Sequence, residues 1–238
     1  SIDIYPGEVV GLLGHNGAGK STLMKILTGV YTKDSGTIQI LNEKTGSMDD
    51  VDVRDPLQGR ELGLSMVFQE LNLLENMNVA ENIFLGCEKT KATGVDQYAM
   101  KVEAQKILDS LDMPLDAGEY VYHLTIAQQQ MVEIAKALST NARIIIMDEP
   151  TAALTKNESE ELYRITEKLR DDGKSIIFIS HRLEDMYRLA GRVTVFRDAH
   201  YIGTYNVAEI QPPELIKAMV GREIKDLFPK PAITPGEE

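Results

Sequence analysis

Four short apolar runs, separated by helical patterns, constrain the fold of this 238-residue chain more than any other feature. Runs of four or five residues are the length of buried strands and are too short for buried helices. Near-continuous apolar runs are typical of parallel strands that helices cover on both faces. The alternation of strands and helices predicts an α/β fold with a mostly parallel sheet. The runs are residues 9–13, 64–68, 144–147 and 176–179.

Three regions depart from this alternation. Residues from about 71 to 140 carry helical patterns and loops, and predict an inserted helical subdomain. Residues 193–196 and 201–205 alternate around a polar turn and predict a hairpin outside the parallel core. Residues 1–5 also alternate polar and apolar side chains, which predicts a further strand.

The last residues of the chain are rich in proline and weakly apolar. Residues 228–238 therefore predict a linker or tail, and residues 1–227 predict the folded domain.

Composition argues against several classes of protein. The chain has 25 Lys and Arg against 37 Asp and Glu, a formal net charge of −12. Nucleic-acid binders normally carry a basic face, so we expect no nucleic-acid partner. No apolar run approaches the roughly 18–20 residues that a membrane-spanning helix needs. A single cysteine, Cys87, excludes an internal disulfide framework.

A glycine-rich segment directly follows the first apolar run and matches G-x-x-x-x-G-K-[ST]. Glycines allow backbone N–H groups to approach phosphate oxygens, because no Cβ lies in the way. Lysine supplies a positive charge to the β- and γ-phosphates, and the serine hydroxyl can bind Mg²⁺. The helix that follows directs its positive end at the same anion. The candidate nucleotide-binding residues here are Gly14, His15, Asn16, Gly17, Ala18, Gly19, Lys20, Ser21 and Thr22.

An acidic pair, Asp148 and Glu149, ends the apolar run at 144–147. Ligands of open parallel sheets bind at the carboxyl ends of the strands, where this pair lies. Because side chains alternate along a strand, the two acids point in different directions. We expect Asp148 to hold Mg²⁺ and Glu149 to polarise the attacking water.

Four further features appear in a set order along the chain. Residues 67–69 end a run with glutamine, residues 124–128 open a helix, residues 151–155 follow the acidic pair, and residues 179–181 end in histidine. In this order and spacing they resemble the ATP-binding subunits of ABC transporters, over nearly the whole chain. The resemblance implies a P-loop NTPase core with an antiparallel β subdomain and an inserted helical subdomain.

The resemblance also implies roles for individual residues. Gln69 would sense Mg²⁺ and the attacking water, and His181 would contact the γ-phosphate. Catalysis would therefore use Glu149, His181 and Gln69, and the metal would be held by Ser21, Gln69 and Asp148. The cofactors implied are ATP and Mg²⁺. Residues 124–128 would be the signature motif, which binds the γ-phosphate held by a second ATPase domain.

The signature segment can also be interpreted physically. Thr125 and Gln128 form the pattern of a capping box at a helix start, which offers free N–H groups and positive dipole to an anion. Ile126 and Ala127 stand where two glycines are usual in the family. We expect the Ala127 Cβ to narrow the approach of a nucleotide, while its N–H stays available.

Residues 124–138 and 219–222 are similar to those of monosaccharide importers of the ribose, galactose and xylose type. In that subgroup one polypeptide carries two ATPase domains, so this chain would be the N-terminal half. The partners implied are integral-membrane permease subunits and, indirectly, a sugar-binding protein, at the cytoplasmic face of the membrane. We expect the aromatic residue that stacks on adenine to lie upstream of residue 1.

Two other functions remain open from the sequence. One is a soluble ABC-type ATPase not tied to transport, which the lack of a basic face and of a cysteine cluster argues against. The other is a regulatory half that binds ATP with little turnover. Glu149 and His181 argue against the regulatory half, whereas Ile126 and Ala127 favour it.

Overall fold

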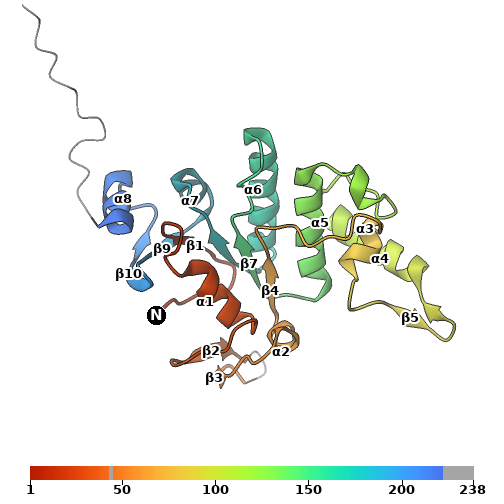
Figure 1. Cartoon of the computed structure of the whole chain (residues 1–238), viewed down its shortest axis with the longest axis horizontal. Coiled ribbons are helices and arrows are strands. Elements are labelled where there is room, and N and C mark those ends of the chain that lie inside the picture. Colours follow the sequence, from red (N-terminus) through yellow and green to blue (C-terminus); the bar gives the residue numbers. More distant parts are fainter. Residues whose placement is uncertain (43–44, 222–238) are drawn as a thin grey trace, which may run out of the picture.

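The computed structural model describes residues 1–42 and 45–221 and builds them around a six-stranded sheet (Figure 1). The strand order is β10-β9-β1-β8-β7-β4; β10 runs antiparallel to β9, and the other neighbours are parallel. The predicted mostly parallel sheet is therefore confirmed. The strands are β1 (Val9–Leu13), β4 (Leu64–Val67), β7 (Ile144–Asp148), β8 (Ser175–Ile179), β9 (Arg192–Arg197) and β10 (His200–Asn206).

Helices cover both faces of this sheet, as near-continuous apolar strands require. Helices α6 (Lys156–Asp171) and α7 (Leu183–Leu189) lie on one face and α1 (Lys20–Leu27) on the other (Figure 1). Along β7, Ile145 and Met147 belong to the core cluster that contains the apolar side chains of α6 and α7. Ile146 instead packs in the cluster that contains Met24 of α1. This alternation, repeated along β8, decides which side chains at the strand ends face α1.

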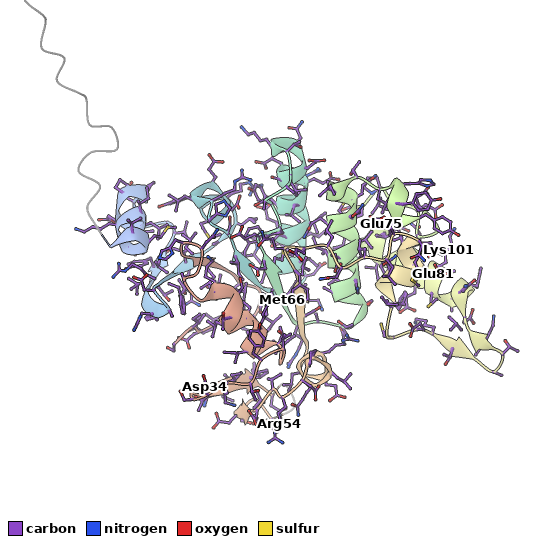
Figure 2. All side chains as sticks on the ribbon, viewed as in Figure 1. Asp34, Arg54, Met66, Glu75, Glu81 and Lys101 are labelled. Atoms are coloured by element: carbon purple, nitrogen blue, oxygen red, sulfur yellow. The ribbon has the colours of Figure 1, made fainter. Side chains whose placement is uncertain are left out.

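A helical subdomain lies beyond β4 and β7, at the right of Figure 1. Glu75, Glu81 and Lys101 mark it in Figure 2. It also contains a short exposed hairpin that the sequence did not predict, because two-residue strands carry no alternating pattern. Its elements are α3 (Val79–Ile83), β5 (Thr90–Lys91), β6 (Gly94–Val95), α4 (Gln97–Ser110), the 3-10 turn η1 (Val121–His123) and α5 (Ile126–Ser139).

Asn82 of α3 holds the loop that leads from the sheet into this subdomain. Its side chain is fully buried, and its Oδ1 accepts a hydrogen bond from the Leu74 N–H at 2.7 Å. Its Nδ2 donates to the carbonyls of Leu74 and Asn78, both at 3.0 Å. A buried amide with all these partners stabilises one loop conformation, since leaving them unpaired would be costly.

The antiparallel β subdomain is small. It consists of β2 (Ile38–Leu41) and β3 (Met48–Val51), with α2 (Pro56–Glu61) beside them, near Asp34 and Arg54 at the bottom of Figure 2.

Two predictions about strands are wrong. The predicted hairpin is present as β9 and β10, but its predicted place outside the core is wrong, because β9 pairs parallel with β1 and extends the main sheet. Residues 1–5 form no strand. The Tyr5 carbonyl instead accepts a hydrogen bond from the Ser175 hydroxyl, and the Tyr5 ring lies against the Arg192 guanidinium.

The C-terminal helix of the described chain, α8 (Pro212–Val220), ends at Gly221, whose φ of 77° suits a glycine cap. The predicted tail at residues 228–238 lies outside the described residues.

Candidate nucleotide-binding site

The loop between β1 and α1 has the backbone of an anion cradle. Gly17 and Gly19 have φ of 82° and 90°, a region that side-chain-bearing residues rarely adopt. A Cβ added to Gly14 would lie 2.5 Å from the Phe196 carbonyl oxygen, so the strand and loop approach too closely for alanine. Helix α1 starts after Gly19 with no side-chain cap and no acidic residue in its first turn. Its first N–H groups and positive dipole end are therefore free to meet an anion.

Lys20 is held inside this loop. It is 5% exposed, and its Nζ donates to the carbonyls of Gly14 at 2.7 Å and His15 at 3.3 Å. Burial lowers the pKa of Lys20, while the nearby charges of Glu149 and Asp148 oppose that shift. The ammonium thus lies on the loop's own carbonyls and within electrostatic reach of both acids.

Asp148 faces the phosphate loop because it shares the α1 side of β7 with Ile146. It is 7% exposed, and its carboxylate accepts a hydrogen bond from the Ser21 hydroxyl. Burial raises the pKa of Asp148, and the hydrogen bond from Ser21 works against that shift. The structure therefore brings the phosphate loop and the acidic pair together, although more than 120 residues separate them.

Glu149 lies just past the end of β7 and pairs with His181. Its φ of 49° is left-handed, and its N–H donates to the Ile179 carbonyl at 3.0 Å. Its Oε2 lies 3.0 Å from His181 Nδ1. The Glu149 side chain is 13% exposed, whereas that of His181 is 53% exposed. The ends of β7 and β8 thus place an acid and a histidine in contact beside the phosphate loop.

Gln69 is exposed and lies two residues past β4. Since Val67 of β4 pairs in parallel with Met147 of β7, Gln69 lies at the same edge of the sheet as Asp148.

The signature residues lie on the helical subdomain. The capping box is present: Thr125 Oγ1 accepts from the Gln128 N–H at 3.3 Å, and Gln128 Oε1 accepts from the Thr125 N–H at 2.9 Å. Within the described residues, no hydrogen bond or ion pair joins this segment to the phosphate loop. Ile126 is 49% exposed and Ala127 is 6% exposed. The exposed side chain at this helix end is therefore that of Ile126, whereas Ala127 is buried; the effect of either side chain on a bound nucleotide stays a prediction.

The other residues of the phosphate loop differ in exposure. Ala18 is fully buried, whereas Asn16 and Thr22 are exposed. His15 is also exposed, and its Nε2 lies 3.4 Å from Asp198 Oδ1 in the turn between β9 and β10.

The oxygen atoms at this site fit Mg²⁺ bound together with phosphate. Ser21 and Asp148 supply a hydroxyl and a carboxylate, which are hard ligands of the kind Mg²⁺ prefers. In residues 1–42 and 45–221, no group of three or more His, Cys, Asp or Glu could hold a metal alone. An ion here would need phosphate oxygens and water to complete its shell, which is how Mg²⁺ usually binds in nucleotide sites.

The sequence does not predict that Glu133 of α5 is buried, because it lies outside the apolar helical stripe of Met131, Ile134, Ala135 and Leu138. It is 5% exposed, and its Oε1 accepts from the Asn72 N–H at 2.9 Å. This bond connects the segment after Gln69 to the helix that begins at the signature. Burial raises the pKa of Glu133, against the effects of Lys136 and the Asn72 N–H.

Glu133→Gln is expected to stabilise the nucleotide-free chain at pH 7 by about 1 kcal/mol. Because the pKa of Glu133 is raised in the folded state, the folded chain binds more protons than the unfolded chain between the unfolded and the folded pKa. The stability of the chain therefore falls as pH rises through that interval. Urea unfolding at pH 7 and pH 4 measures the free energy of unfolding of the variant and of the parent chain. The difference between these two free energies should shrink at pH 4. Glu160→Gln, at an exposed position of α6, serves as the control. A Glu133→Gln variant that is less stable than the parent chain at pH 7 would contradict the claim that burial of the Glu133 carboxylate reduces stability.

A strand, a phosphate loop and a helix beside an acidic strand end define a P-loop nucleotide-binding domain. The chain belongs to the ABC transporter family, whose model matches residues 1–152.

Curated relatives of the chain are ATP-binding proteins of sugar import. It is 45% identical over 238 residues to a ribose import ATP-binding protein RbsA of Caldanaerobacter subterraneus, covering 100% of this chain and 47% of the relative. It is 45% identical to a ribose import ATP-binding protein RbsA 2 of Escherichia coli O157:H7, covering 96% of this chain and 44% of the relative. The chain thus spans about half the length of the curated relatives it matches.

Solved structures share the fold. The ADP conformation of an ATP-binding cassette of an ABC transporter superposes with a TM-score of 0.78 at 24% identity, covering 93% of this chain and 91% of that one. A dimeric cassette bound to ADP and phosphate after hydrolysis has a TM-score of 0.71 at 25% identity, covering 87% and 88%. No helix within residues 1–42 and 45–221 is long and apolar enough to cross a membrane.

Proposed function

We propose that this chain is an ATP-binding and ATP-hydrolysing domain that energises an ABC importer of a monosaccharide. The observation that carries the proposal is the convergence of Lys20 and Ser21 with Asp148 and Glu149 at the carboxyl ends of the parallel strands. The names of the relatives support sugar import and make ribose the first sugar to test.

In this proposal the backbone N–H groups of the phosphate loop and Lys20 bind the β- and γ-phosphates. Ser21 and Asp148, with Gln69 beside them, hold Mg²⁺, which when bound would neutralise charge on the phosphate oxygens. Glu149 accepts a proton from the attacking water. The water oxygen bonds to the γ-phosphorus as the bond between the γ-phosphorus and ADP breaks. His181, paired with Glu149 at 3.0 Å, orients that carboxylate and contacts the γ-phosphate. Most of the rate enhancement would come from positioning and charge stabilisation.

We assign the signature residues 125–128 to a nucleotide held by a second ATPase domain. Their separation from the chain's own phosphate loop supports this, and so does the dimeric state of the cassette described above. The proposed domain is residues 1–227, followed by a linker at 228–238 and a second ATPase half. Permease subunits and a sugar-binding protein complete the transporter, with this domain at the cytoplasmic face of the membrane.

Shared sites can be tested by following phosphate release by the chain at increasing protein concentration, then with a second ATP-binding domain joined to it. The specific activity is expected to rise roughly tenfold or more as paired domains form, since the N–H groups that the capping box leaves free at the start of α5 stabilise charge on the nucleotide only in the pair. A rate per chain that never changes would contradict shared sites. Absence of hydrolysis in every arrangement would contradict the ATPase itself.

A nucleotide-binding half with little turnover is the second candidate. The exposed Ile126 favours it, because a large apolar side chain stands where a nucleotide would approach the helix end. Ile126→Gly separates the two: a large rise in turnover supports the low-turnover half, and no rise supports the active ATPase.

A further inference from the structure

Asp185, in the first turn of α7, is a fully buried carboxylate that three hydroxyl groups contact. Thr151 Oγ1 donates to Oδ2 at 2.8 Å, and Ser180 Oγ donates to the same oxygen at 2.5 Å. Tyr163 of α6 donates from its phenol to Oδ1. A buried charge is tolerated only when it is hydrogen-bonded in this way, so each donor is held tightly in place.

Two of these donors belong to the loops that carry the proposed catalytic groups. Thr151 lies two residues after Glu149, in the loop that follows β7, and Ser180 lies directly before His181, in the loop that follows β8. Both side chains are 1% exposed. A single oxygen atom, Asp185 Oδ2, therefore connects the two loops. Its two donors, Thr151 and Ser180, are 29 residues apart in the sequence.

Arg182 adds a second connection between the same loops. Its N–H donates to Ser180 Oγ at 2.9 Å, and its Nη1 donates to the Thr151 carbonyl at 3.4 Å. Its Nε lies 3.8 Å from Asp185 Oδ1, which partly compensates the buried negative charge. The hydroxyl of Ser180 thus accepts from one neighbour while it donates to the other.

The Glu149 backbone explains why such a support is needed. Its left-handed φ of 49° is a strained conformation for a residue with a side chain, and it persists only where the surroundings fix it. The 3.0 Å contact between Glu149 Oε2 and His181 Nδ1 depends on both loops keeping their place. A shift of about 1 Å in a catalytic group can lower a rate on the order of 100-fold.

We propose that Asp185 is a positioning residue that couples the Glu149 loop to the His181 loop through the hydroxyls of Thr151 and Ser180. The role rests on the proposed ATPase function. Asp185 is fully buried, so we assign it no contact with the nucleotide; it acts through the two loops. Tyr163 attaches it to α6, which carries no group of the proposed catalytic site.

Thr151→Val and Ser180→Ala test the coupling, because each removes one donor to Oδ2. Both are expected to lower kcat for ATP hydrolysis roughly tenfold, with KM and nucleotide affinity nearly unchanged. Thr151→Ser keeps the hydroxyl and is expected to retain most of kcat. Tyr163→Phe removes the donor from α6 and is expected to keep kcat within about twofold. Circular dichroism at the assay temperature shows that each variant is folded.

A spectroscopic measurement tests the coupling without turnover. The His181 ring signals in NMR spectra of the chain are expected to move in Thr151→Val, although the Thr151 hydroxyl donates to Asp185 and not to that ring, and to stay in place in Thr151→Ser. Unchanged kcat and unchanged His181 signals in Thr151→Val would overturn the proposal. An equal fall of kcat in Tyr163→Phe would overturn it too, since Asp185 would then act only on stability. If the parent chain fails to hydrolyse ATP in any arrangement, the proposed function fails, while the His181 signals still decide the coupling.

Discussion

Glu149→Gln is expected to lower ATP turnover by roughly 100-fold or more while ATP affinity stays within about threefold. The variant keeps the size of the side chain and a carbonyl oxygen that can face His181, but loses the carboxylate that accepts the proton from water. Binding should persist, because we assign the phosphate contacts to the loop backbone, Lys20 and Ser21 rather than to Glu149.

Phosphate release and equilibrium binding of ATP, measured on the same preparations, check this expectation. Glu61→Gln is the matched control: it makes the same chemical change at an exposed position at the end of α2, away from the site. Turnover in Glu149→Gln close to that of the control would remove Glu149 from the role of base. Loss of binding together with turnover would indicate that Glu149 supports the fold of the loop instead.

Lys20→Ala is expected to weaken ATP binding by roughly 30- to 100-fold, the loss of one or two charge-assisted hydrogen bonds. The ammonium is 5% exposed and already lies on the Gly14 carbonyl, at the centre of the loop. Burial lowers the pKa of Lys20, which means that the folded chain without nucleotide stabilises the charged ammonium less well than water does. The same substitution should therefore leave the stability of the nucleotide-free chain nearly unchanged.

Titration calorimetry with ATP measures the affinity, and urea unfolding measures the stability. Lys156→Ala, at an exposed position in the first turn of α6, removes the same charge away from the site. Equal affinities of the two variants for ATP would contradict the assignment of residues 14–21 as the phosphate loop.

The parallel core could be predicted because buried strands need apolar side chains on both faces, and this requirement appears directly in the sequence. The phosphate loop could be predicted because its glycines, Lys20 and Ser21 meet a local geometric demand. The approach of Asp148 to this loop follows from the strand order and from the alternation along β7. The roles of these residues in ATP hydrolysis remain predictions.

Other features depend on packing that no local pattern records. Asp185 has the sequence pattern of an acid in a helix's first turn, and only the fold shows that it is buried under two loops. Ile126 and Ala127 look equivalent in the sequence, but the direction of α5 buries one and exposes the other. The hairpin of β9 and β10 has the sequence pattern of a separate unit. Only the fold shows that β9 pairs with β1 and so extends the main sheet.

The most direct test of the central claim is a crystal structure of the chain with a non-hydrolysable ATP analogue and Mg²⁺. We predict that Lys20 Nζ leaves the Gly14 carbonyl and contacts the β- and γ-phosphate oxygens. We also predict that the cation is bound next to Ser21 and Asp148. A triphosphate bound elsewhere, or bound here with Lys20 and Asp148 both unchanged and out of contact with it, would contradict the account.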